Sequence, residues 1–344
     1  MNQQIRLSIV VPMYNAGPYL EPCVRSLLDQ DLEPPEYEIL LVNDGSTDDT
    51  LQVAERLNAR HPNIRIISQQ NKGQGAARNL GFERSQGEFV WFVDADDIVA
   101  RRCLGTLLRI LQSHNLDLVT FDILRVLDRT VPEGFGFVAD APLERAESGV
   151  QYIASHNYDN GPWGYIIRAE YLRERNVRFV EGHWCEDGMF SLSAIAGARR
   201  VAKLPVQVYG YVLNPNSTTS SKSRFHQRTM LGDFLYAVDY FDHFMEGTRQ
   251  AMDEVPGFRK RVACRRDSYV FFLLIRLLRA RLGYAYTKTI YKTLLAKGRI
   301  PVRDLCGEDY PGVKYRLLSS FVSCPVLFLG LGWILNALRP AKKE

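Results

Sequence analysis

An apolar segment that runs straight into a cluster of acids constrains the fold of this chain more than any other feature. Residues 89–93 read Phe-Val-Trp-Phe-Val, and Asp94, Asp96 and Asp97 follow within four positions. A fully apolar run of this length predicts a strand that is buried on both faces, as in parallel sheets covered by helices. In such sheets, ligands bind just beyond the carboxyl ends of the strands, which is where these acids would lie.

The three carboxylates favour a ligand or metal site at this strand end. Crowded acids repel one another unless a cation neutralises them, and carboxylate oxygens suit Mg²⁺ and Mn²⁺. The alternative is a helix N-cap, because acids also stabilise the first turn of a helix. A cap needs only one acid, so a group of three is better explained by a cation or a ligand.

The first third of the chain alternates strand and helix patterns. Besides residues 89–93, strand patterns occur at residues 7–11, 38–42, 64–67 and 116–121. Helical spacing of apolar residues separates them, at residues 20–28, 51–57, 74–84 and 104–111. Ser46, with Asp49 three positions later, predicts the N-cap of the second helix. The alternation predicts an α/β fold with a mostly parallel central sheet.

Polar residues that suit a nucleotide follow two other predicted strands. Pro12, Tyr14 and Asn15 follow the first strand, and Asp44 follows the second. Because the carboxyl ends of parallel strands share one edge of the sheet, we expect these side chains to meet the acids after residue 93. A ring can stack on a base, a carboxylate can accept hydrogen bonds from it, and a metal can bind its phosphates. Taken singly, Tyr14 also suits a core position and Asp44 a turn, but together they favour a nucleotide site.

A glycine-containing segment, residues 71–75, precedes the third predicted helix, which contains Arg78. The segment is neither a Walker P-loop nor a complete G-x-G-x-x-G fingerprint, which argues against a P-loop nucleotidase and a Rossmann dehydrogenase. Its glycines suit a tight turn as well as they suit phosphate contact. Arg78 is the predicted phosphate contact.

Taken in order, these segments resemble the successive motifs of family 2 glycosyltransferases. The resemblance covers residues 8–15, 38–48, 71–73, 77–79 and 87–97. The order and spacing of five segments over roughly ninety residues make it far more specific than any single motif. It implies a GT-A nucleotide-sugar-binding fold and inverting transfer from a UDP-sugar or related nucleotide-sugar donor to an acceptor hydroxyl.

The resemblance also implies roles for individual residues. The nucleotide-binding residues are expected to be Pro12, Tyr14, Asn15, Asp44, Arg78, Asp94 and Ala95. Asp94 and Asp96 form the D-x-D motif of the family. Asp96, with Asp97 beside it, is expected to hold Mn²⁺ or Mg²⁺ on the diphosphate.

A second acidic pair, Glu186 and Asp187, precedes an apolar helical pattern at residues 189–195. By itself the pair suits charge complementarity at a helix N-terminus as well as it suits a site. The family places an acidic pair before an apolar helix here, which implies Asp187 as the catalytic base and Glu186 as an orienting group. Inverting transfer needs a carboxylate that takes the proton of the acceptor hydroxyl.

The last third is predicted to be helical, with apolar helical spacing at residues 225–244 and 268–286. Basic residues gather at residues 259–266, so this region can lie on anionic lipid or form a solvated helix face. Residues 317–338 carry no charge and are long enough to span a bilayer. Pro325 and nearby glycines favour an interfacial or packed helix over a span.

Composition limits the partners of the chain. A net charge of +4 over 344 residues gives no support for binding to nucleic acid. The six cysteines form no zinc spacing, and residues 1–6 begin no secretory segment, so a cytoplasmic location is expected.

We expect a GT-A domain at residues 1–222, with a donor half at about 5–125 and an acceptor half at about 150–222. Residues 223–344 are expected to form a helical region, which either lies at the cytoplasmic face of the inner membrane or packs on the catalytic domain with a solvated face.

The resemblance implies a role in bacterial exopolysaccharide, capsule or lipopolysaccharide assembly, with a saccharide or lipid-linked saccharide as the acceptor. A sugar nucleotidyltransferase is one alternative, but it needs a glycine-rich phosphate loop directly after the first strand, which this chain lacks. A non-catalytic nucleotide-sugar-binding relative is the other, and it would have no use for a base such as Asp187.

Overall fold

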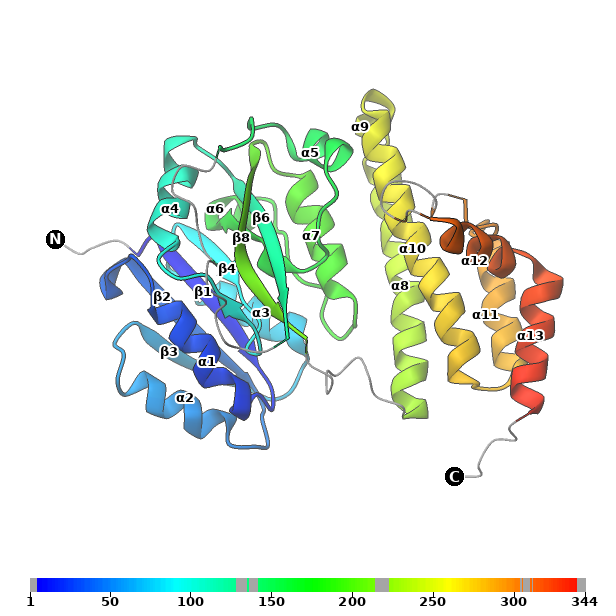
Figure 1. Ribbon diagram of the computed structural model, residues 1–344, viewed down its shortest axis with the longest axis horizontal. Coiled ribbons are helices and arrows are strands. Elements are labelled where there is room, and N and C mark those ends of the chain that lie inside the picture. The colour runs from blue at the N-terminus through cyan, green and yellow to red at the C-terminus, as the bar shows by residue number, and fades with distance from the viewer. Residues whose placement is uncertain are drawn as a thin grey trace. The chain divides into compact units, whose positions relative to one another are not determined.

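The computed structural model describes residues 5–127, 135, 142–213, 223–303, 305, 310 and 312–338. The chain divides into two compact units (Figure 1). The first unit comprises residues 1–152 and 158–215, and the second comprises residues 153–157 and 216–344.

An eight-stranded mixed sheet forms the centre of the first unit. Its strands are β1 (Leu7–Met13), β2 (Tyr37–Asp44), β3 (Ile64–Gln69), β4 (Phe89–Phe92), β5 (Ile98–Val99), β6 (Leu118–Val126), β7 (Tyr165–Arg168) and β8 (Val201–Val212). They lie in the order β3-β2-β1-β4-β7-β6-β8-β5. The first four strands in this order pair in parallel, as do β6 and β8, whereas β7 runs antiparallel to β4 and β6. The predicted α/β fold with a mostly parallel sheet is therefore confirmed.

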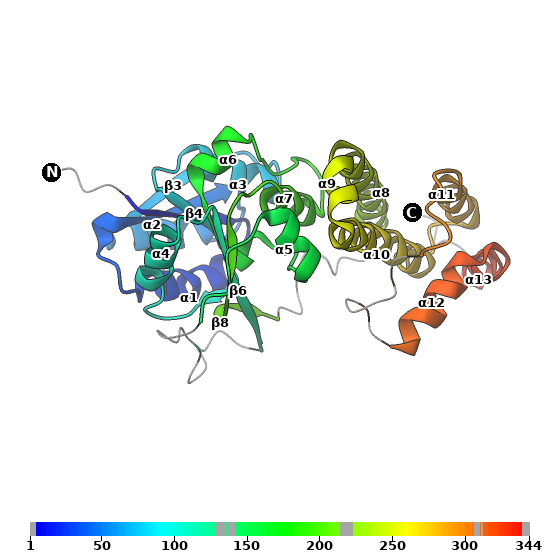
Figure 2. The same ribbon diagram turned by 90° about the horizontal axis from the view of Figure 1, so that it is seen from above.

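Helices cover both faces of this sheet (Figure 2). They are α1 (Gly17–Leu28), α2 (Thr50–Asn58), α3 (Gln74–Glu83), α4 (Leu104–Ser113), α5 (Gly149–Ser155), α6 (Ala169–Glu174) and α7 (Glu186–Ala196). Apolar residues of α1, α2 and α4 pack with one set of alternate side chains from β1, and α3 packs on the opposite face. Strands β1, β2 and β4 are buried along their whole length, as expected for strands covered on both sides.

The second helix begins later than predicted. Asp49, and not Ser46, is its N-cap residue. The hydroxyl of Ser46 instead accepts a hydrogen bond from the backbone N–H of Asn15 at 3.1 Å. Ser46 therefore joins the loops that follow β1 and β2.

Glycines allow α3 to lie unusually close to its neighbours. A Cβ at Gly81 would lie 2.3 Å from Cγ1 of Val10 on β1 and 3.0 Å from Cγ2 of Val42 on β2. A Cβ at Gly75 would lie 2.8 Å from the carbonyl oxygen of Val180. Helix α3 is thus held between the sheet and the segment that leads into α7.

The second unit consists of helices. They are α8 (Arg224–Gly247), α9 (Arg249–Glu254), α10 (Pro256–Ala280), α11 (Tyr284–Ala296), α12 (Val313–Ser323) and α13 (Pro325–Ala337). The predicted helix at residues 225–244 is present as α8. The predicted helix at residues 268–286 is broken, because Arg281 has a left-handed backbone with φ 47° and Gly283 has φ 105°.

The uncharged segment at residues 317–338 is also broken. Helices α12 and α13 meet at Cys324, and their axes differ in direction by 85°. Within the described part of the chain, no single helix is both long and apolar enough to cross a membrane, although this bent pair reaches the required length and composition together.

Candidate active site

One buried arginine joins the acids after β4 to the acidic pair that begins α7. Arg78 lies on α3 with its side chain 0% exposed. Its Nη2 donates to Oδ1 of Asp94 at 2.7 Å. Its Nη1 donates to Oδ1 of Asp187 at 2.6 Å and to Oε1 of Glu186 at 3.2 Å. The fold thereby brings together two acidic motifs that are more than ninety positions apart in the sequence.

Arg78 does not have the exposed position that its predicted phosphate contact requires. Both of its terminal nitrogens are bonded to carboxylates, and its Nε has no hydrogen-bond partner among the described residues. Burial alone would lower the pKa of the guanidinium, but the charges of Asp187, Asp94 and Glu186 outweigh burial and raise it. Arg78 therefore remains a cation between the two acidic motifs.

The two acids at the start of α7 differ in how far their side chains are exposed to solvent. The side chain of Glu186 is 7% exposed and that of Asp187 is 31% exposed. Burial raises the pKa of Asp187 well above its ordinary value; Arg78 opposes the rise, and Glu186 and Asp94 add to it. Cys185, just before the pair, has φ 71°, an uncommon conformation for a residue other than glycine. Asp187 thus combines a raised proton affinity with access to solvent.

Asp97 is held inside the protein by β8. Its Oδ2 accepts a hydrogen bond from the hydroxyl of Tyr209 at 2.6 Å, and its Oδ1 accepts one from the backbone N–H of Val212 at 2.8 Å. Burial, followed by the charges of Asp94 and Asp96, raises the pKa of Asp97 to about 8. Both oxygens thus already accept hydrogen bonds from the protein, and the role of Asp97 as a metal ligand stays a prediction.

Asp96 fits that role better. It is half-buried, beside the buried Asp97 at the end of β4. Among the described residues, no group of three or more His, Cys, Asp or Glu side chains is placed to hold a metal. A metal at Asp96 would therefore have few carboxylate ligands from the described residues. Mg²⁺ at phosphate sites is commonly bound in this way, through one or two carboxylates and the phosphates of the substrate.

The predicted nucleotide residues after β1 differ in exposure. Tyr14 is 47% exposed, which leaves its ring available for stacking. Pro12 is buried within β1, and Ala95 is buried in the main hydrophobic core. The side-chain oxygen of Asn15 accepts a hydrogen bond from the backbone N–H of Thr47 at 2.8 Å. Asn15 thus shapes the loop, whereas Tyr14 offers a surface to a ligand.

The carboxylate of Asp44 organises the loop before α3. Its Oδ1 accepts hydrogen bonds from Nε2 of Gln69 at 2.7 Å and from the backbone N–H of Lys72 at 2.8 Å. Its Oδ2 accepts one from the backbone N–H of Gly73 at 2.9 Å. Asp44 therefore lies at the predicted edge of the sheet, where it fixes the loop at residues 71–73.

A family model described as glycosyl transferase family 2 matches residues 8–169. This segment of the chain belongs to glycosyltransferase family 2. The match covers the five segments on which the resemblance was based and ends at the start of α6.

Among curated proteins, the uncharacterized glycosyltransferase EpsJ of Bacillus subtilis is 36% identical over 217 residues. That alignment covers 62% of this chain and 62% of EpsJ, so the chain matches less than two thirds of the length of this relative.

Two solved structures resemble the chain at low sequence identity. One is S. aureus TarS 1-349 in complex with UDP-GlcNAc, with a TM-score of 0.55, 22% identity, and coverage of 86% of this chain and 93% of that one. The other is a mannosyltransferase from Pyrobaculum calidifontis in complex with GDP-Man and Mn²⁺, with a TM-score of 0.52, 16% identity, and coverage of 98% and 88%. At these identities the likeness shows the fold alone, and it confirms the predicted GT-A type.

Sequence reasoning missed Asn79 of the family 2 domain. Its Nδ2 donates to the carbonyl oxygen of Phe179 and to Oε1 of Glu181, each at 2.9 Å, and its Oδ1 accepts from the backbone N–H of Phe179 at 2.9 Å. Asn79 thus ties the segment before α7 to α3. The available signal was an Asn directly after Arg78 in the predicted helix at residues 74–84.

Tyr209 was also missed, because the sequence pattern indicated only a strand. Its hydroxyl donates to Asp97 and accepts from the backbone N–H of Asp94 at 3.1 Å. Its ring stacks on Trp163, with centroids 5.1 Å apart and planes inclined by 10°. Tyr209 therefore supports the D-x-D segment of the family 2 domain from beneath.

Proposed function

We propose that this chain transfers a sugar from a nucleotide-sugar donor, in particular a UDP-sugar, to an acceptor hydroxyl with inversion of configuration. The observation that carries the proposal is the ion-pair network of Arg78, which joins Asp187 to Asp94 of the D-x-D segment. The network brings a candidate base beside the acids expected to receive the donor. Membership of residues 8–169 in family 2 supports transfer as the reaction.

In this proposal the donor lies beyond the carboxyl ends of β1, β2 and β4. Tyr14 stacks on the base, and the loop that Asp44 fixes lies beside the nucleoside. Asp96 would hold Mn²⁺ or Mg²⁺, which would neutralise negative charge on the diphosphate. The complexes of TarS with UDP-GlcNAc and of the mannosyltransferase with GDP-Man and Mn²⁺ support a nucleotide-sugar and a divalent cation as ligands of this fold.

Asp187 acts as the general base. It takes the proton of the acceptor hydroxyl, whose oxygen forms a bond to the anomeric carbon while the bond to the diphosphate breaks with its electron pair on the leaving oxygen. A raised pKa suits this task, because proton transfer is most efficient when the base has a pKa near the working pH. Glu186 orients the acceptor, and we reassign Arg78 from phosphate contact to positioning of both acids.

We further propose that the enzyme works in bacterial surface polysaccharide assembly, on a saccharide or lipid-linked saccharide, and that its second unit contacts the membrane surface. Relatives named as bacterial glycosyltransferases support the first part. Exposed apolar side chains on α12 and α13 support the second. The sugar nucleotidyltransferase alternative is disfavoured by family 2 membership, and the non-catalytic alternative by the placement of Asp187.

A donor screen with the full chain tests the proposal. The protein is incubated with Mn²⁺, a panel of UDP- and GDP-sugars, and saccharide and lipid-linked acceptors, and release of nucleoside diphosphate is measured. We expect metal-dependent release with at least one donor and acceptor pair, and loss of release in Asp96→Asn. Release of pyrophosphate would point to a nucleotidyltransferase, and donor binding without turnover would point to a non-catalytic relative; either result contradicts the proposal.

A further inference from the structure

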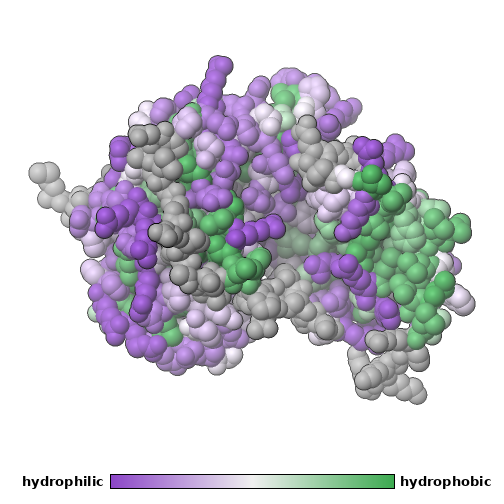
Figure 3. Space-filling view, viewed as in Figure 1, coloured by the Kyte–Doolittle hydropathy of each residue, from purple (hydrophilic) through white to green (hydrophobic). Residues whose placement is uncertain are grey.

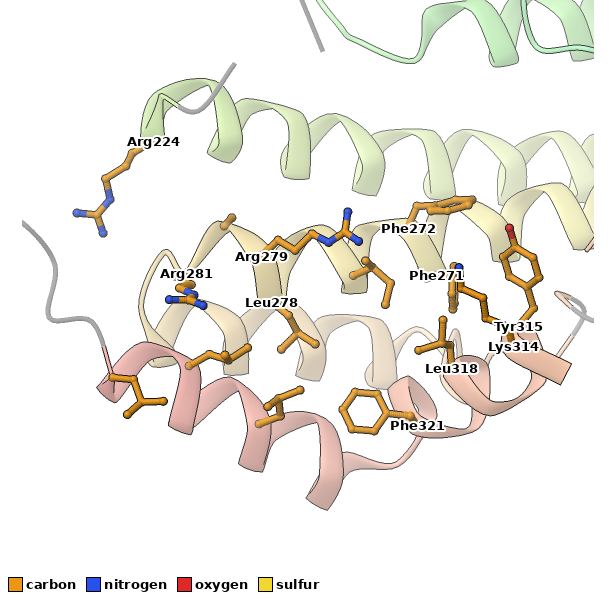
Figure 4. Close-up of a pocket in the computed structure, with 15 residues that line it drawn as sticks. Arg224, Phe271, Phe272, Leu278, Arg279, Arg281, Lys314, Tyr315, Leu318 and Phe321 are labelled. Atoms are coloured by element: carbon orange, nitrogen blue, oxygen red, sulfur yellow. The ribbon is translucent and has the colours of Figure 1, made fainter. Parts of the chain in front are cut away.

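The second unit contains a large cavity between α10, α12 and α13 (Figure 4). Its volume is about 1300 Å³, above the usual range of roughly 300–1,000 Å³ for pockets that hold a drug-sized molecule. Its walls are mainly apolar, with Phe271 and Leu278 from α10 opposite Leu318 and Phe321 from α12. Ile275 of α10 also lines it. The cavity therefore suits a long hydrocarbon chain better than a small polar ligand.

Cationic residues line the same cavity. Arg279 and Arg281 lie at the end of α10, Arg224 lies at the start of α8, and Lys314 lies on α12 beside Tyr315 (Figure 4). None of the fifteen lining residues is acidic. Across the described residues of the unit, none of these four cations forms an ion pair within 4.0 Å. They are thus available to an anion from outside the chain.

Other cations of the same unit do have carboxylate partners. Arg266 pairs with Asp267 at 2.7 Å and with Asp242 at 3.3 Å, and Arg299 pairs with Asp242 at 2.8 Å. Lys297 pairs with Asp239. These pairs distinguish Arg266, Arg299 and Lys297 from the four cations that line the cavity.

Exposed apolar side chains extend from the cavity over α12 and α13. Leu317 is 66% exposed, Val326 is 80% exposed and Trp333 is 59% exposed. Figure 3 shows apolar surface gathered over this part of the second unit. An exposed apolar surface of this kind commonly marks a membrane or partner site, and Trp is enriched at the membrane–water interface.

We propose that this cavity binds one anionic membrane phospholipid, with an acyl chain between the apolar helices and the phosphate at Arg279 and Arg281. The inference rests on the membrane contact in the proposed function and adds a specific site and a class of lipid. The cations of the cavity suit the phosphate of a phospholipid, because guanidinium groups bind phosphate well. The apolar walls suit its acyl chain, because they would bury hydrocarbon.

Charge argues against two other occupants. A second copy of the unit would bring its own unpaired cations to the same place, where they would repel. Residues 339–344 carry three basic side chains and one acidic one, so they match the cations of the cavity poorly. An anionic lipid is the occupant that both the charges and the apolar walls favour.

Binding to sedimentable vesicles of phosphatidylcholine, with and without 30% phosphatidylglycerol, tests the proposal; the lipid fraction is chosen to be about that of an anionic leaflet. The Arg279→Gln/Arg281→Gln variant removes two cavity cations. The matched control, Lys288→Gln/Lys292→Gln, removes two exposed cations of α11 that do not line the cavity. Ala280→Phe fills part of the cavity without a change in charge. Far-ultraviolet circular dichroism and transfer to a soluble acceptor check the folding of each variant.

We expect wild-type protein to bind the anionic vesicles and not the neutral ones. Each cation near an anionic surface contributes a factor of about five to binding, so the cavity variant should bind about thirtyfold more weakly while the matched control changes less. Ala280→Phe should also bind more weakly, and inorganic phosphate should not compete. Native mass spectrometry with phosphatidylglycerol should show one bound lipid.

Equal losses in the cavity variant and the matched control would show that general surface charge, and not this cavity, attracts the membrane. Competition by inorganic phosphate would assign the cations to a free anion and overturn the lipid site. A dimer that forms without lipid and masks the cavity would assign it to a second copy. Failure of the lipid site would leave transfer to a soluble acceptor intact, so it is distinguishable from failure of the proposed transfer reaction.

Discussion

The two units of the chain contain arginines in opposite environments. In the first unit, Arg78 is fully buried and shared among three carboxylates. In the second, Arg279 and Arg281 are exposed at an apolar cavity and have no carboxylate partner among the described residues. A buried cation with several acidic partners fixes the geometry of those acids, whereas an exposed cation without a partner remains open to a ligand. By this contrast, Arg78 is expected to hold carboxylates in place, whereas Arg279 and Arg281 can bind a ligand.

The largest expected effect is at Asp187, the proposed base, which is hydrogen-bonded to Arg78. Asp187→Asn should lower kcat by about 10²- to 10⁴-fold, because the amide cannot take the proton of the acceptor hydroxyl. Steady-state kinetics with the donor and acceptor from the screen measure the effect. Glu55→Gln, an exposed change on α2, serves as the control and should leave the rate unchanged. A rate within a fewfold of wild type in Asp187→Asn would remove this residue from the chemistry.

The comparison itself is tested by one substitution in each unit. Arg78→Met should destabilise the protein by about 3–5 kcal/mol, because it leaves a group of partly buried carboxylates without their cation. Arg279→Met should change stability little, because that side chain is exposed. Urea unfolding followed by tryptophan fluorescence measures both. Equal losses in the two variants would mean that Arg78 contributes no more than a surface residue.

Salt should separate the two kinds of arginine further. An increase from about 0.1 to 1 M NaCl shortens the screening length from about 10 to about 3 Å, which weakens exposed interactions far more than buried ones. Binding of the chain to anionic vesicles should therefore fall severalfold. The stability difference between wild type and Arg78→Met should persist at both salt concentrations. If that stability difference disappears at 1 M NaCl, the Arg78 pairs behave as surface ion pairs. The proposed difference between Arg78 and the exposed arginines would then be wrong.

The smallest effect is a shift in the pH profile. Asp187 acts as a base only when deprotonated, so kcat/KM should rise with pH through its pKa. Burial raises that pKa above the ordinary value of 3.8, and the charge of Glu186 raises it further. Glu186→Gln removes this charge, so the acidic limb of the profile should move to lower pH. A limb that stays in place, or moves to higher pH, would show that the titrating group is not Asp187 beside Glu186.

Local patterns were sufficient to predict the longer strands and helices of the donor half. The continuous apolar run at residues 89–93 identified β4 because full burial of a strand leaves a signature in consecutive residues. Strand β5 has only two residues, which is too short to show any periodicity. The break between α10 and α11 was missed because apolar spacing continues across it, although Gly283, which has a positive φ, was a signal for it.

Partners that lie far apart in the sequence were the harder part of the site. The sequence placed Arg78 at the start of a helix, where phosphate and carboxylate are equally suitable partners for a guanidinium. Which of them is present depends on Glu186, 108 positions away. Tyr209 reaches Asp97 across 112 positions, and nothing within β8 marks that contact. Motif resemblance supplied the acids, but only the fold showed what holds them.

Gly81 sets how closely α3 lies to the sheet, and with it the position of Arg78. It lies one helical turn after Arg78 on α3, and the absence of its side chain lets the helix backbone rest on Val10 and Val42. The position of the Arg78 guanidinium therefore depends on how closely α3 approaches β1 and β2. An added methyl group at Gly81 would push α3 outward and move Arg78 relative to the acids. In the proposed site, the spacing between Asp94 and Asp187 thus depends on a glycine that contacts neither acid.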